Sequence, residues 1–219
     1  MTSTLELRLS KLIGGGKIYF FPSELPPGLV IPNEWRDFGP KSPNRQSIPS
    51  AWGAFAGELP WISEWLERSV HGTAIVVTDR VYLGYLYTCR GRPYMYLGGV
   101  PICKDARTVI DQLPSRLQHF YQTVHDGFTF CVDLSMGPAR SQDISILENF
   151  CDDDGLEPRR LLSVFSNGAG DHLTIDLSAA PLRPCIWWHE DPCHPEDVED
   201  MWDLIDTWMS IFLEDSEIV

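Results

Sequence analysis

Residues 73–97 read TAIVVTDRVYLGYLYTCRGRPYMYL, and this stretch decides the fold class. It contains three runs rich in β-branched, aromatic and aliphatic residues, at 73–78, 81–88 and 93–97, separated by short charged turns. Such runs predict three consecutive antiparallel strands. In the middle run both sets of alternating positions are partly apolar, so we expect it to be an inner strand with both faces covered.

Helical and further strand patterns lie on either side of these strands. Residues 60–69 begin with a proline that suits a first helical turn, and residues 114–124 have apolar side chains three and four apart. Residues 143–150 fit either a strand or a helix. The sequence therefore predicts an α+β fold in which an antiparallel sheet is flanked by helices. Further strands are expected at residues 128–134, 161–166, 172–177 and 184–189.

The last element has the clearest pattern. Large apolar residues recur at helical spacing from Val198 to Phe212, which predicts a long C-terminal amphipathic helix over residues 195–213. Pro195 suits its first turn. Like-charged carboxylates four residues apart cost about 0.2–0.5 kcal/mol per pair, which is small beside about 1.5–3 kcal/mol for each fully buried large side chain. The helix is therefore expected to form despite its acidic residues.

Length and composition favour one domain. The chain has 219 residues, 43% of them hydrophobic, and no internal repeat, so residues 1–219 are expected to form a single domain without needing disulfides. Its N-terminal segment, about residues 1–70, is rich in proline and tryptophan and is expected to be irregular. The six cysteines include no CxxC pair and are expected to be reduced thiols.

The charge is concentrated at one end. The net charge is −14, and residues 185–219 contribute −11 of it, with eleven acidic residues and no lysine or arginine. Such a field repels phosphate backbones and anionic membranes, so direct binding to nucleic acid or to a membrane is not expected. With no apolar run of membrane-spanning length and no secretory signal pattern, we expect a cytoplasmic protein.

Few motifs indicate catalysis. Residues 189–194 read HEDPCH, but zinc-protease histidines lie four apart on one helix, whereas His189 and His194 are five apart with a proline between them. The GGGK at residues 14–17 lacks the other residues of a phosphate-binding loop, and the DDDG at 152–155 lacks the pattern of a calcium loop. His125-Asp126 suits acid–base chemistry but also a helix terminus.

Four pieces of the second half of the chain follow one another in a recognisable order. They are LP at 113–114 opening a helix that ends at HDG (125–127), NGAGDHLTIDL at 167–177, IWWHE at 186–190, and a final Trp-rich amphipathic helix. In this order, rather than in any one piece, the chain resembles the SUKH superfamily over about residues 113–213, and the first hundred residues match no part of the pattern. The resemblance implies an α+β fold and, in bacteria, immunity proteins that bind and block polymorphic toxins, many of them nucleases or deaminases.

Charge and resemblance together predict a non-enzymatic immunity protein that binds and neutralises a cognate polymorphic or secretion-system toxin, expected to be a nuclease or deaminase, through an acidic surface. We expect no cofactor, metal or catalytic residue. The alternatives are a hydrolase or metal-dependent enzyme using His189, Glu190 and His194, or an acidic adaptor of a secretion machine. An acidic face complements a basic partner and speeds association. The residues expected to contact the partner are Glu190, Asp191, Glu199, Asp203 and Asp206.

Overall fold

The computed structural model describes residues 2–43, 45–103, 108–147 and 160–219. Its first sheet has five antiparallel strands in the order β1-β2-β3-β4-β5. The expected three-strand meander is confirmed as β2, β3 and β4, and β3 is indeed an inner strand, since it pairs with both of the others. The bounds of the five strands are β1 Lys17–Tyr19, β2 Gly72–Val77, β3 Val81–Cys89, β4 Arg92–Gly99 and β5 Phe128–Phe130.

The two faces of β3 enter different apolar layers. Leu83 and Tyr85 belong to the large core beneath α2 (Pro60–Arg68), whereas Tyr82 packs in a smaller cluster with Leu9 of α1 (Thr2–Leu12). The alternation of strand side chains produces this division. It explains why both faces of the middle run are apolar in the sequence.

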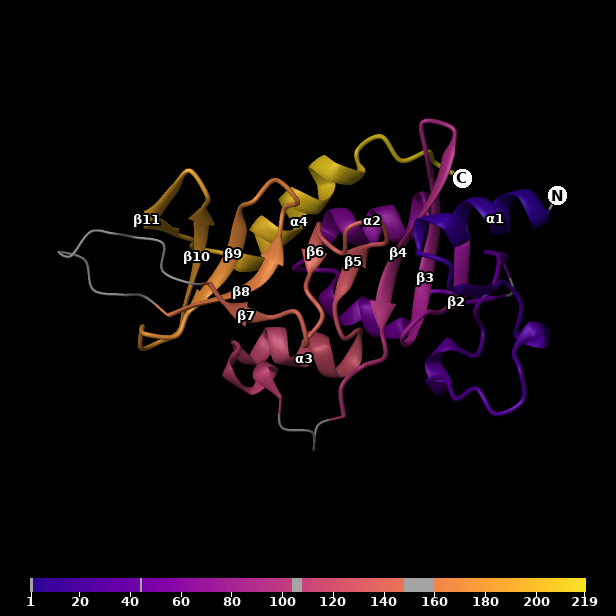
Figure 1. The fold of residues 1–219 in the computed structure, drawn as a ribbon, viewed down its shortest axis with the longest axis horizontal. Coiled ribbons are helices and arrows are strands. Elements are labelled where there is room, and N and C mark those ends of the chain that lie inside the picture. Colours follow the sequence, from indigo (N-terminus) through magenta and orange to yellow (C-terminus); the bar gives the residue numbers. More distant parts are fainter. Residues whose placement is uncertain (1, 44, 104–107, 148–159) are drawn as a thin grey trace.

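A second sheet, with strand order β11-β10-β9-β8-β6, holds the later strands. Figure 1 shows it beside the first sheet. The expectation of one sheet was therefore too simple, because the run at 128–134 ends as a strand at Phe130. The chain then turns through Leu134 and Met136, both at φ 57°, before it joins the second sheet. The bounds are β6 Gly137–Pro138, β7 Ser145–Ile146, which also pairs with β8, β8 Leu161–Ser166, β9 His172–Asp176, β10 Arg183–Trp188 and β11 Asp191–Asp197.

The C-terminal helix is shorter than expected. α4 spans Met201–Leu213, 13 residues, and the residues before it form β11, which pairs with β10. Asp200 begins the helix, since its carboxylate accepts hydrogen bonds from the N–H groups of Trp202 (2.8 Å) and Asp203 (3.2 Å). An aspartate at this position satisfies two free backbone donors, which Pro195 cannot do. The amphipathic pattern is nevertheless present, with Ile205 and Met209 buried.

One apolar core joins the two sheets and the helices α2, α3 and α4. It includes Leu83 of the first sheet, Phe165 of the second, Phe120 of α3 (Ser115–Thr123) and Ile205 of α4. Figure 1 shows α4 extending along the second sheet toward the first. The proline-rich segment adds Trp35, Phe38, Trp52 and Phe55 to this core through short 3₁₀ helices, η1 Pro22–Glu24, η2 Asn33–Trp35 and η3 Ser50–Phe55; a fourth, η4 Val109–Gln112, precedes α3.

The structure also bears on the state of the cysteines and on membrane-spanning helices. Cys193 is disulfide-bonded, so the expectation that all six cysteines are reduced is wrong at that position. In the described part of the chain, no helix combines the length and the apolar character that crossing a membrane requires.

Candidate partner-binding surface

The hairpin of β10 and β11 and the first turn of α4 present a series of carboxylates to solvent. β11 is the edge strand of its sheet, so one side of it faces no other strand. Pro192 and Pro195 remove two backbone donors from this strand, a common way to keep an edge from pairing with other chains. The exposed acidic residues here are Glu190, Asp191, Glu196, Asp197, Glu199, Asp200 and Asp203.

Some of these carboxylates have partners within the chain. Asp197 pairs with Arg183 (2.8 Å), and Glu196 accepts a hydrogen bond from the indole N–H of Trp188 (3.2 Å). By contrast, Glu199 and Asp203 form no ion pair with any residue of the described segments. Their charge is therefore available to a cationic partner.

Four of the five expected contact residues are on this surface, but they do not form one compact site. Glu190 and Asp191 lie at the β10–β11 turn, whereas Glu199 and Asp203 lie beyond the other end of β11. A seven-residue strand is roughly 20 Å long at about 3.3 Å per residue. A partner that contacts both ends must therefore span an extended surface.

The fifth residue, Asp206, is not on the surface. It is 7% exposed, and its two carboxylate oxygens accept hydrogen bonds from the backbone N–H groups of Trp61 (2.9 Å) and Ile62 (3.0 Å), in the first turn of α2. Burial raises the pKa of this carboxyl more than the two donors lower it. The expectation that Asp206 contacts a partner is replaced by a structural role, because the first turn of α2 supplies donors that no local pattern in α4 reveals.

The two histidines of the HEDPCH stretch bind different carboxylates. The Nδ1 atom of His189 lies 2.7 Å from Asp171, and that of His194 lies 2.8 Å from Asp191. Burial raises the pKa of Asp171, but hydrogen bonds from His189 and Asn167 outweigh it, so the net direction is downward. Among the described residues, no group of three or more histidine, cysteine, aspartate or glutamate side chains is placed to hold a metal ion.

Asp171 also organises the turn between β8 and β9. Its carboxylate accepts hydrogen bonds from the Asn167 side chain (2.9 Å) and from the backbone N–H of His189 (3.1 Å). Gly170, at φ 106°, lets the turn pass directly over the His189 ring, which a Cβ at that position would contact at 3.1 Å. The NGAGD sequence thus joins this turn to the end of β10.

His125 is fully buried and holds a fixed tautomer. Its Nδ1 lies 3.0 Å from the carbonyl oxygen of Gly99, which can only accept, so Nδ1 carries the proton. The Nε2 atom then accepts from the hydroxyl of Tyr85 (2.6 Å), which in turn accepts from the indole N–H of Trp52 (2.8 Å). Burial lowers the pKa of His125 to about 3, against the effect of the Gly99 carbonyl. The ring is neutral near pH 7, which favours a structural role.

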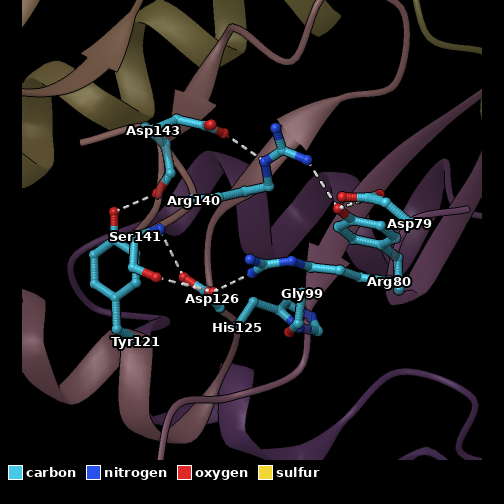
Figure 2. A network of polar contacts seen from close by, with 11 residues as sticks. Asp79, Arg80, Gly99, Tyr121, His125, Asp126, Arg140, Ser141 and Asp143 are labelled. Atoms are coloured by element: carbon cyan, nitrogen blue, oxygen red, sulfur yellow. Dashed lines mark hydrogen bonds and ion pairs between the residues drawn. The ribbon is translucent and has the colours of Figure 1, made fainter. Parts of the chain in front are cut away.

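Asp126 lies in a polar network that the sequence did not reveal. Figure 2 shows its carboxylate between Ser141 and Arg80. It accepts from the backbone N–H (2.7 Å) and the hydroxyl (3.1 Å) of Ser141, and Arg80 lies 3.8 Å away. Nearby, Arg140 donates to Tyr82 (2.8 Å) and also bonds Asp143. The network ties the first sheet to the segment between β6 and β7, both of which pair with β8 of the second sheet.

A cavity of about 210 Å³ lies beside this network, lined in part by Arg80, Arg140 and Asp126. Each guanidinium group that lines the cavity has a carboxylate partner: Arg80 lies 3.8 Å from Asp126, and Arg140 pairs with Asp143. Signals for the network were present in the sequence only as the HDG triplet at 125–127, which also suits a helix terminus.

Of the other motifs, Gly14, Gly15 and Gly16 lie in the turn between α1 and β1, with Gly14 and Gly15 at positive φ, and Lys17 is the first residue of β1. The DDDG sequence at 152–155 lies outside the described residues.

Comparisons with known proteins identify no relative: no family model, curated protein or solved structure matches the chain.

Proposed function

We propose that this protein is an immunity protein that binds and neutralises a cognate toxin without catalysing a reaction. The observation that carries the proposal is the series of exposed carboxylates at residues 190–203, of which Glu199 and Asp203 have no cationic partner among the described residues. The resemblance of residues 113–213 to the SUKH superfamily supports the same conclusion. The cytoplasm, where an intracellular toxin acts, is the proposed location.

The negative charge of this surface indicates a partner with a basic face. A toxin that cuts or deaminates nucleic acid has a basic active face, and an acidic protein can cover that face by occupying the place of the phosphates. Opposite charges also accelerate association, which matters for an inhibitor that must reach a toxin before it reaches its substrate.

The geometry favours contacts by side chains rather than by strand addition. The prolines in β11 leave gaps in its row of edge donors, so a partner strand would lose hydrogen bonds there. Trp188 is partly exposed next to Glu196 and supplies an aromatic anchor among the acids.

Co-expression tests the function directly. Cells that produce the toxin encoded by the neighbouring reading frame should grow only when this protein is also present, and the two proteins should co-purify. Because the contact is electrostatic, affinity should fall steeply as salt rises.

Paired substitutions test the surface. We expect Glu199→Gln with Asp203→Asn, and separately Glu190→Gln with Asp191→Asn, to weaken binding about tenfold or more and to reduce its salt dependence. The matched control is Glu34→Gln with Asp37→Asn, which removes the same charge from two exposed residues elsewhere. Equal loss in all three doubles would mean that only net charge matters, and no loss in the first two would place the contact elsewhere. Absence of both rescue and complex would overturn the immunity function itself.

A further inference from the structure

A groove of about 530 Å³ lies between residues 41–43 and 45–50, η3 and α2. This volume is within the roughly 300–1,000 Å³ typical of small-molecule sites. The groove lies in the proline-rich segment, far in sequence from the acidic C-terminal surface, and has no part in the function proposed above.

The floor of the groove is apolar and firmly held. It includes Ile48, Pro49, Trp52 and Leu66, and the last two belong to the main core. The hydrogen bond from Trp52 to Tyr85 fixes the indole ring from below. A rigid apolar floor of this kind can stabilise a flat or branched apolar group by removing it from water.

The wall of the groove carries two cations. The Arg45 guanidinium is half-buried and packs against Gly39, at φ 138°, where a side chain would collide with it. Its side chain forms no hydrogen bond or ion pair with any residue in the described parts of the chain. The Lys41 ammonium donates to the carbonyl oxygen of Glu67 near the end of α2, which uses one of its three N–H groups.

The local charge is therefore positive in a strongly acidic protein. Glu67 is the one carboxylate among the described residues that line the groove, against two cations. A partly buried guanidinium without an acceptor gains most from an anion that bonds two of its N–H groups at once.

We propose that this groove binds a small organic anion, a carboxylate or phosphate attached to an aromatic or branched apolar body. The anionic group pairs with Arg45 and Lys41, and the apolar body lies on Trp52 and Ile48. Both anion types match the guanidinium, so the test includes each of them.

Calorimetric titration of the 219-residue protein tests the site with three probes: 3-phenylpropionate, phenyl phosphate and the uncharged 3-phenylpropanamide. We expect saturable binding of at least one anion, and at least tenfold weaker binding of the amide. Preference between the two anions identifies the natural group as carboxylate or phosphate. Saturable binding by neither anion, or equal binding of the amide, overturns the proposal.

Substitutions locate the binding to the groove. Arg45→Gln should weaken the anion at least tenfold, whereas Arg36→Gln, which removes an exposed arginine of the same segment, should leave it unchanged. Gly53→Leu adds a side chain to the wall at a position that has open space around it, so it should block the probe without disturbing the fold. Binding that survives both Arg45→Gln and Gly53→Leu would place the anion elsewhere and refute the site.

Discussion

The carboxylate of Asp206 accepts a hydrogen bond from the backbone N–H of Ile62, a residue 144 positions away in the sequence. Its second oxygen accepts from Trp61, so one side chain of α4 satisfies two of the free donors of α2. Asp206→Ala should therefore lower the free energy of unfolding by about 1–3 kcal/mol, measured by urea denaturation. Thr207→Ala, at the exposed neighbouring position, is the control and should change it by less than about 0.5 kcal/mol. Equal changes in the two variants would mean that the hydrogen bonds of Asp206 to α2 contribute nothing to the free energy of unfolding.

Gly98 lies directly against the buried His125 ring, and a Cβ there would approach the ring carbon Cγ to 2.5 Å. Because both ring nitrogens are held by hydrogen bonds, the ring cannot move aside cheaply. Gly98→Ala should destabilise the fold by about 1–3 kcal/mol or more, as overpacking of a core does. Thermal unfolding of the variants measures the effect. Gly53→Ala is the control and should be close to neutral, because its added methyl group meets no other atom within 4 Å.

His125 should make stability depend on pH in the acidic range. Its pKa is about 3 in the folded chain and 6.5 for the ordinary side chain, so between these values the unfolded chain binds a proton that the folded chain does not. The contribution of neutral His125 to the free energy of unfolding is complete above pH 6.5. Between pH 6.5 and pH 3 it is lost by about 1.4 kcal/mol per pH unit.

The comparison with His125→Gln isolates this effect from the other titrating groups. Wild-type stability should decrease more steeply than that of the variant between pH 6 and 4, and the wild-type ring should show no titration above pH 4 by NMR. Parallel stability profiles, or a ring that titrates near pH 6, would contradict the buried neutral histidine.

The Asp126 network predicts a contrast between a buried and an exposed aspartate. Asp126→Ala leaves the Ser141 donors without their acceptor in a largely buried place and should cost about 1–3 kcal/mol. Asp143→Ala removes only the exposed partner of Arg140 and should cost less than about 1 kcal/mol. Chemical denaturation of both variants measures the difference, and a reversed order would show that the network does not stabilise the fold.

The cysteines predict a thiol count. Cys89, Cys103, Cys131 and Cys185 form no disulfide and Cys193 is disulfide-bonded, so protein purified without reductant and then denatured should react at four thiols, and at six after reduction. Alkylation before lysis tests the proposed location as well, because a reducing cytoplasm keeps thiols free. Six labelled cysteines from intact cells support the cytoplasm, and four argue for an oxidising compartment.

Local patterns predicted several elements well. The strands β2, β3 and β4 and the helix α2 follow from alternating or helical spacing that involves residues only a few positions apart. The acidic segment at 190–203 was equally visible, since its charge and exposure need no distant partner. Errors arose where one pattern allowed two structures, as at residues 195–197, which suited a helix start but belong to β11 and pair with β10.

The sequence by itself determined which segments alternate, which face of each helix is apolar, and where the negative charge is concentrated. Only the tertiary structure decided that Asp206 is a buried cap while Asp203, three residues away, is exposed. It also decided that His125 is a neutral core residue and that Arg45 lines a groove. The reason is physical: periodicity depends on near neighbours in the chain, whereas the state of a polar side chain depends on donors and acceptors that distant segments bring to it.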